Sequence, residues 1–176
     1  KMYKAAIEIQ ERLVKENPKA YEPDLAMSYN NLASLYNKIQ RFNESEMLYK
    51  AAIEIKERLV KENPKAYEPD LAGSYDNLAI LYNEIQRHDE SEKIYKAAIE
   101  IQERLAKENP RAYESDLAGS YNNFALLYCN IQRFDESEKM YKAAIEIQER
   151  LVKENPKVYE PDLVSSYDDL AFVYYE

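Results

Sequence analysis

Pairs of polar side chains recur at one position of this chain, and their types and spacing suggest a binding chemistry. The pairs are 46 residues apart and consist of Asn30 and Asn31, Asp76 and Asn77, Asn122 and Asn123, and Asp168 and Asp169. An Asn side chain both donates and accepts hydrogen bonds. A ladder of such pairs can therefore bind the backbone of an extended peptide with little dependence on its sequence. Alternatively, the amides only face solvent or bridge neighbouring helices.

A second column beside the pairs becomes more apolar along the chain, from Ser34 through Ile80 and Leu126 to Phe172. If this column faces a groove, its last three residues could form an apolar pocket for a ligand side chain. Packing between neighbouring helices explains them equally well. The expected ligand is a neutral or basic peptide, because the acidic residues of the groove outweigh Lys38: Asp76, Glu84, Asp168 and Asp169.

Residues able to support catalysis are scarce. His88 stands where the other repeats have Phe42 and Phe134, which is typical of a residue that packs at a turn. Cys129 is interpreted as a variable groove residue because no column of histidines accompanies it to form a nucleophilic pair. No Glu-x-x-His pair is present to build a di-metal site. The sequence therefore predicts no enzyme activity, no metal site and no cofactor.

The ladder belongs to a longer internal repeat. The heptapeptide Tyr-Lys-Ala-Ala-Ile-Glu-Ile begins at four positions spaced by 46 residues: Tyr3, Tyr49, Tyr95 and Tyr141. Sixteen of the 17 tyrosines fall into four columns with the same spacing. With two Gly, no Trp and many Ala, Glu, Lys and Leu residues, the composition favours helix. A repeat of this length in an all-α chain is typical of a solenoid.

Each repeat contains two amphipathic segments. The first, helix A, is predicted over about 24–39 and starts after Pro23 with Asp24 as its N-cap. The second, helix B, is predicted over about 43–62 and ends before Pro64. A short polar connector, Pro-Lys-Ala-Tyr-Glu-Pro or a close variant, is expected between successive pairs. The whole chain, 1–176, is then one repeat array with a leading helix B at 3–17, A–B pairs at 24–62, 70–108 and 116–154, and a final helix A at 162–175.

The segment from Tyr29 to Ile55 resembles the tetratricopeptide repeat (TPR), in the elongated form found in kinesin light chains and many bacterial arrays. The matching residues are Tyr29, Leu32, Ala33 and Tyr36 on helix A and Phe42, Ser45, Tyr49 and Ala52 on helix B. The resemblance implies a right-handed superhelix of antiparallel helix pairs, in which the A helices line a concave groove that binds peptides or protein segments. It also places one residue per repeat at a close contact between helices A and B: Ala33, Ala79, Ala125 and Ala171.

This sequence departs from the family pattern in two ways. Gln40, Gln86 and Gln132 replace the usual turn glycine. The period of 46 residues exceeds the roughly 34 of the standard repeat, which indicates extra helical turns, mostly on helix B. The function that the resemblance implies is a non-catalytic protein–protein interaction scaffold.

The alternative function is a structural spacer or self-assembly element that stacks head to tail. The chain starts inside a helix B and stops inside a helix A, and the piece missing between one copy and the next corresponds to Ile39 through Glu46. Both ends then expose apolar stripes that a neighbouring repeat normally covers. Because the two surfaces differ, such a contact would propagate instead of closing as a dimer.

Charge and composition exclude several other classes of partner. The net charge of −9, with every Lys or Arg interleaved with Asp or Glu, argues against nucleic acid. No apolar run approaches the roughly 18 residues of a membrane span, and no signal peptide is visible. The lone Cys129 excludes an intrachain disulfide, which fits a cytoplasmic protein but also many secreted chains. Since Lys1 lies inside a helical pattern, the chain is expected to be a fragment.

Overall fold

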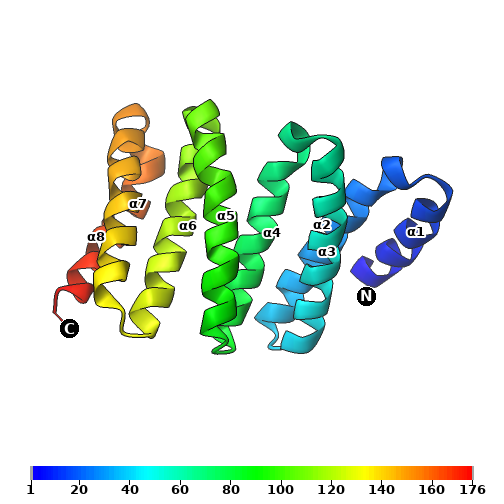
Figure 1. Ribbon diagram of the computed structural model, residues 1–176, viewed down its shortest axis with the longest axis horizontal. Coiled ribbons are helices and arrows are strands. Elements are labelled where there is room, and N and C mark those ends of the chain that lie inside the picture. Colours follow the sequence, from blue (N-terminus) through cyan, green and yellow to red (C-terminus); the bar gives the residue numbers. More distant parts are fainter. Residues whose placement is uncertain (1, 176) are drawn as a thin grey trace. The chain divides into compact units, whose positions relative to one another are not determined.

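The computed structural model describes residues 2–175, and over this range it consists of α-helices joined by short turns, without strands (Figure 1). The helices are α1 (Met2–Glu16), α2 (Pro18–Lys38), α3 (Phe42–Glu62), α4 (Pro64–Glu84), α5 (His88–Glu108), α6 (Pro110–Asn130), α7 (Phe134–Glu154) and α8 (Pro156–Val173). Odd-numbered helices are of type B and even-numbered helices of type A. The all-α prediction is confirmed.

The A-type helices begin six residues earlier than the sequence predicted. Helix α2 starts at Pro18 and not at Asp24, so the expected connector forms its first turns. Proline is tolerated at the first helical position because the N–H there has no intrahelical partner. Asn17 is the N-cap and makes no side-chain capping bond, so the assignment of Asp24 as the cap was wrong. Pro23 lies inside α2, and α6 carries Ser115 at the equivalent position without a change in helix bounds.

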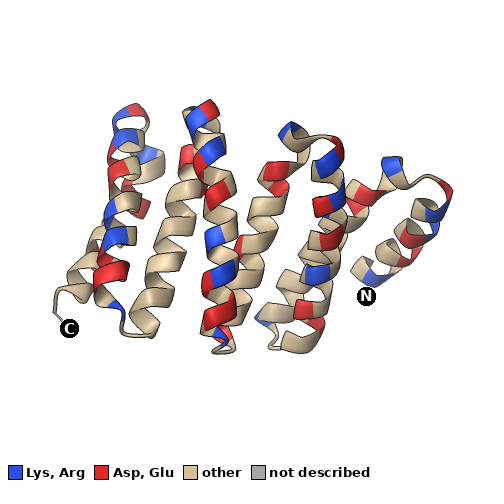
Figure 2. Cartoon of the chain, viewed as in Figure 1, with Lys and Arg blue, Asp and Glu red and all other residues tan. Residues whose placement is uncertain are grey.

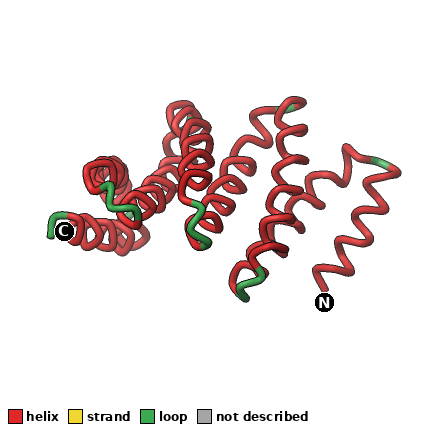
Figure 3. The backbone as a smooth tube through the Cα atoms, turned by 60° about the horizontal axis from the view of Figure 1, so that its bottom comes forward, coloured by secondary structure: helices red, strands yellow, loops and turns green. Residues whose placement is uncertain are grey.

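The extra length of the repeat is shared between its two helices. Every helix from α2 to α7 has 21 residues, so the prediction that the added turns fall mostly on helix B was wrong. The A-to-B turns are short, as at Ile39–Arg41, and a single asparagine separates each B helix from the next A helix (Figure 3). Within each unit, such junctions leave adjacent helices antiparallel.

The A-to-B turn has the hydrogen bonds of a Schellman motif. The Arg41 N–H donates to the Tyr36 carbonyl at 2.8 Å, and the Gln40 N–H donates to the Asn37 carbonyl at 2.9 Å. This arrangement requires a left-handed residue, and Gln40 has φ 59°. The same conformation recurs at Gln86 and Gln132. The turn therefore keeps the geometry that glycine normally supplies in the family.

The helices form two compact units, one reaching Arg87 and one starting at His88. In the first unit α2 packs on α1 and α3, and α3 packs on α4. In the second unit α6 packs on α5 and α7, and α7 packs on α8. Most of the packing within a unit is therefore between helices that follow one another in the chain.

Small residues let the two helices of a pair approach closely. Ala33 and Ser45 are completely buried, and the Ser45 hydroxyl donates to the Ala33 carbonyl at 2.8 Å. The Ser137 hydroxyl makes the same bond to the Ala125 carbonyl, at 2.9 Å. Serine on helix B thus stabilises the pair across its tightest contact. Ala171 occupies the same column on α8 but is exposed, because no described helix follows α8 in the chain.

Charged residues of both signs alternate along the B-type helices, as on α3 and α7 (Figure 2). On α3, Arg58 contacts Glu54, four residues earlier, at 3.4 Å and also Glu22 of α2 at 2.9 Å. Exposed ion pairs of this kind contribute little to stability. Within residues 2–175, no helix has the length and apolar character needed to cross a bilayer.

Candidate functional site

The predicted ladder lies on the A-type helices. In the first unit, Asn30 of α2 and both residues of the α4 pair, Asp76 and Asn77, are half-buried, whereas Asn31 is exposed. In the second unit the α6 pair is half-buried and the α8 pair is exposed: Asn122 and Asn123, then Asp168 and Asp169. The pairs therefore differ in their surroundings from helix to helix.

The first member of the α6 pair bridges two A-type helices. The Asn122 side-chain amide donates to the Ser166 hydroxyl on α8 at 2.8 Å, and Ser166 in turn donates to the Asp162 carbonyl at 3.0 Å. This bond agrees with the alternative interpretation of the ladder, in which the amides bridge neighbouring helices. Asn123 differs, because its side chain makes no hydrogen bond within the described part of the chain.

In the first unit, a cavity of about 220 Å³ brings two ladder residues together. Its polar lining comes from Asn30 on α2, Lys56 on α3, and Asp70, Ser74 and Asn77 on α4. Gly73 also lines it, and a Cβ built at that glycine would meet nothing within 4 Å. The absence of a side chain at Gly73 therefore leaves open space and is not needed to avoid a clash.

Lys56 is the most unusual residue of this cavity. Only 8% of its surface is exposed, and its ammonium donates to the Asp70 carbonyl at 2.9 Å and to the Ser74 hydroxyl at 2.7 Å. Burial lowers the pKa of Lys56, and the Asp70 charge opposes this shift only in part. The equivalent residues are glutamines: Gln10, Gln102 and Gln148. That single substitution in a repeated column is the signal from which the sequence could have singled out Lys56.

The residues of the apolar column are more exposed in the second unit than in the first. Ile80 is half-buried in the first unit, while Leu126 and Phe172 are exposed in the second. Leu126 lies three residues after Asn123, and Phe172 three after Asp169, so each shares a helix face with a ladder residue. Partial burial, together with neighbouring Asp168, raises the pKa of Asp169. This surface combines apolar side chains with acidic charge.

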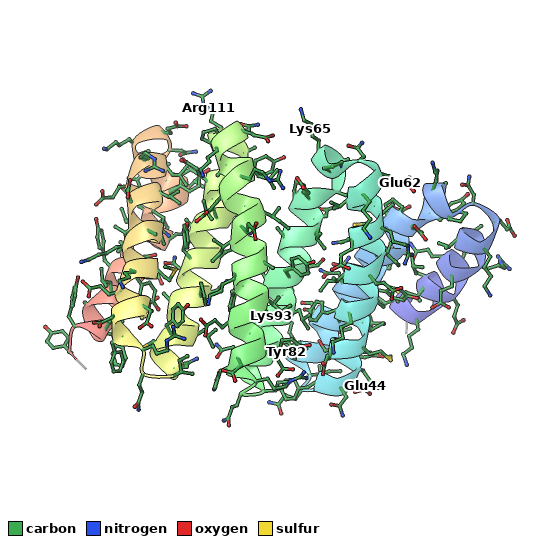
Figure 4. The ribbon with its side chains drawn as sticks, in the orientation of Figure 1. Glu44, Glu62, Lys65, Tyr82, Lys93 and Arg111 are labelled. Carbon is green, nitrogen blue, oxygen red and sulfur yellow. The ribbon has the colours of Figure 1, made fainter. Side chains whose placement is uncertain are left out.

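A cluster that sequence reasoning missed lies at the turn end of the helices. The Glu46 carboxylate accepts hydrogen bonds from Lys50 at 2.7 Å, Tyr82 at 3.1 Å and Arg87 at 2.8 Å. Burial raises the pKa of Glu46, but these three donors outweigh it and the net shift is downward. Figure 4 shows Tyr82 at the same end of the first unit as Glu44. All these groups satisfy one another, so the cluster ties successive repeats together.

The two candidate reactive residues are both half-buried. His88 is the half-buried first residue of α5. Cys129 packs against a buried cluster that includes Tyr141, Ile145 and Leu170, so its interpretation as a groove residue was wrong.

Comparisons with known proteins agree with this architecture. A tetratricopeptide repeat model matches residues 25–64, 71–111 and 117–156. The crystal structure of BtubC (BKLC) from P. vanneervenii has a TM-score of 0.74 and 28% identity over 99% of this chain. The present chain spans 63% of that protein's length.

Two further structures show the fold at lower identity. A Podosopora anserina protein described as a kinesin light chain with nearly identical TPR-like repeats has a TM-score of 0.65 and 21% identity, covering 98% of this chain and 77% of that one. A variant of the same protein has a TM-score of 0.67 at the same identity and coverage. No curated protein sequence matches significantly. The predicted fold class, an all-α array of TPR-type helix pairs, is confirmed, and the chain belongs to the tetratricopeptide repeat family.

Proposed function

We propose that the chain is a non-catalytic scaffold that binds an extended peptide or protein segment along the A-type helices of its units. Tetratricopeptide repeats generally serve protein interaction, which agrees with this proposal. The observation that carries peptide binding is the state of Asn77 and Asn123. Both side chains are half-buried, and neither makes a hydrogen bond within the described residues. Amides left without partners are available to a peptide backbone.

The second unit also supports a preference in ligand charge. Exposed Leu126 and Phe172 share helix faces with ladder residues, and α8 adds the exposed carboxylates of Asp168 and Asp169. An apolar side chain flanked by neutral or basic residues would complement this surface.

The test first selects peptides that bind the 176-residue chain from a displayed library of random peptides. The enriched peptides are synthesised, and their dissociation constants are measured by calorimetry for the wild type and for the double variant Asn77→Ala, Asn123→Ala. We expect about ten-fold weaker binding with an almost unchanged melting temperature, since both side chains lack protein partners. The matched control is Glu54→Ala, a change of an exposed α3 residue. Lower stability with unchanged affinity would show that the amides are structural.

Head-to-tail assembly remains a second candidate function because one observation favours it. Tyr128 of α6 is 5% exposed, whereas its equivalent Tyr174, which directly follows α8, is 59% exposed. The exposed face of α8 therefore corresponds to the face by which α6 packs on the B-type helix α7 in the second unit.

A further inference from the structure

The first unit has a groove on the side of α2 that faces away from the ladder. It lies between the B-type helices α1 and α3, with α2 as its floor, and has a volume of about 270 Å³. We propose that this groove is a second docking site, which binds a protein segment with a large apolar side chain beside a lysine or arginine. The inference goes beyond the proposed function, because it gives the first unit a separate partner on the other side of α2.

The side on which the groove lies follows from the helical period. Tyr29, Leu32 and Tyr36 line it from α2, and their spacing of three and four residues places them on one face. Asn30 and Asn31 lie on the opposite side of α2, since each residue turns about 100° around the helix axis. Helices α1 and α3 both pack on α2, but within residues 2–175 they do not pack extensively on each other. A segment in the groove would therefore leave the ladder accessible.

The floor of the groove is apolar. It is formed by four side chains that are buried in the unit: Ile7, Leu32, Tyr36 and Leu48. In the second unit Phe124 takes the place of Leu32, and its ring lies 5.4 Å from the Tyr95 ring and 4.3 Å from the Tyr128 ring. The smaller Leu32 leaves room in the first unit for a ring that a ligand supplies. An aromatic side chain therefore matches this floor.

The rim of the groove carries an apolar residue where the other repeats carry a charge. Met47 on α3 lines the groove and is 63% exposed. Its equivalents are all lysines: Lys1, Lys93 and Lys139. Methionine is flexible and is enriched at protein interfaces, where its thioether adapts to the partner. The substitution therefore favours an apolar ligand at this groove.

The charges around the groove favour a basic residue beside the apolar side chain. Carboxylates outnumber cations in its lining: Glu8, Glu11 and Glu44 against Lys4 and Arg41. Arg41 is already paired with Glu44. Glu8 makes no ion pair within the described residues, whereas its equivalent Glu54 pairs with Arg58. A lysine or arginine of the ligand would therefore find an unpaired carboxylate next to the apolar floor.

Three short peptides serve as probes: acetyl-Gly-Phe-Lys-Gly-amide, acetyl-Gly-Phe-Glu-Gly-amide and acetyl-Gly-Ala-Lys-Gly-amide. Binding to the 176-residue chain is followed by NMR through isotope-labelled methionine methyl groups. The Met47 signal reports on the groove, and the Met27 signal reports on the cavity beside the ladder. We expect the Phe-Lys peptide to shift the Met47 signal and to bind about ten-fold more tightly than the other two. One of those reverses the charge beside Glu8, and the other lacks the ring that the floor would bury.

Variants identify the groove as the site, with affinity read from the NMR signals of the peptide ring. Met47→Lys installs the residue of the other repeats and Leu32→Phe that of α6, so both variants should fold. Each should weaken binding of the Phe-Lys peptide about ten-fold, the first by charging the rim and the second by filling the floor. Glu8→Gln should reduce the preference for the Phe-Lys over the Phe-Glu peptide. The matched control is Ile9→Lys, which introduces the same lysine at an exposed apolar position of α1 outside the groove and should leave binding unchanged.

Three outcomes would overturn this docking site: an unshifted Met47 signal with the Phe-Lys peptide, equal affinity for the three peptides, or equal effects of Met47→Lys and Ile9→Lys. A shift of the Met27 signal alone would assign the peptide to the ladder side and also count against the groove. None of these results decides the proposed function, which is judged on library-selected peptides and on Asn77 and Asn123. Neither of those asparagines lines the groove.

Discussion

Glutamine holds the left-handed position of every A-to-B turn in the described chain. At φ 59°, the Cβ of Gln40 crowds the backbone, whereas glycine adopts this conformation without that cost. The Gln40 side chain is exposed, so it contributes no core packing. The residue therefore reduces the stability of a turn whose hydrogen bonds are otherwise complete.

Replacing Gln40 by glycine should raise the free energy of unfolding by about 1 kcal/mol, because relief of the left-handed strain exceeds the added entropy of the unfolded chain. Urea unfolding followed by circular dichroism measures the change. Gln40→Ala keeps the Cβ and should show no gain. Equal stabilisation by glycine and alanine would mean that the backbone conformation is not the cause.

At the residue scale, the sequence predicted that the ladder residues lie on the A-type helices. It did not predict which of them bond to a neighbouring helix and which make no hydrogen bond. Periodicity places Asn30 and Asn122 on A-type helices, which the structure confirms. The bond from Asn122 to Ser166 joins residues 44 positions apart, and local pattern carries no information on such a contact. Lys56 differs from the glutamines of its column in the sequence, but its burial depends on three helices meeting around it, which local pattern does not show.

At the scale of the helix, the close contact between A and B helices can be tested by overpacking. Ala125 is fully buried beside Tyr141 and Ile145, and a leucine there has no space. We expect Ala125→Leu to lower the free energy of unfolding by about 1–3 kcal/mol. Denaturant unfolding of the purified variant provides the measurement.

Ala171→Leu is the matched control for this change. Ala171 occupies the same column on α8 but is exposed, so the substitution should alter stability by less than about 0.5 kcal/mol. If both variants lost the same stability, side-chain volume at the A–B contact would not explain the effect.

Helix ends were predicted unevenly, and proline explains why. Glu62 before Pro64 was located correctly as the end of α3, because the residue preceding a proline usually leaves the helical region. The same proline also begins α4 as its first residue, and sequence reasoning overlooked this second role. Pro69 was then mistaken for part of a connector, although it lies inside α4.

At the scale of the whole molecule, the faces of the first and last helices are open in the 176-residue chain. Tyr3 is 43% exposed, whereas its equivalent Tyr141 is 2% exposed. Val164 on α8 and Tyr174 directly after it are likewise exposed, although their α6 equivalents are buried. The equivalent face of an internal helix packs against a neighbouring helix. That neighbour has nearly the same sequence as the helix at the other end of the chain.

We therefore expect this chain to self-associate with increasing concentration, as measured by sedimentation velocity. Val164→Glu combined with Ala171→Glu should shift the chain towards monomer by charging the α8 face. Phe172→Ser should not, because its α6 equivalent, Leu126, stays 48% exposed although a B helix follows α6. A monomeric profile at every concentration would contradict head-to-tail stacking.

The brevity of the turns also has a consequence for folding. Helices α3 and α7 differ at four of their 21 positions, so an A-type helix meets two almost interchangeable partners during folding. A turn such as Ile39–Arg41 brings the chain neighbour into contact with little loss of loop entropy, whereas a distant copy must close a much longer loop. Local contacts also form fastest. Connectivity, more than side-chain identity, thus protects a nearly repetitive sequence from mispairing its own helices.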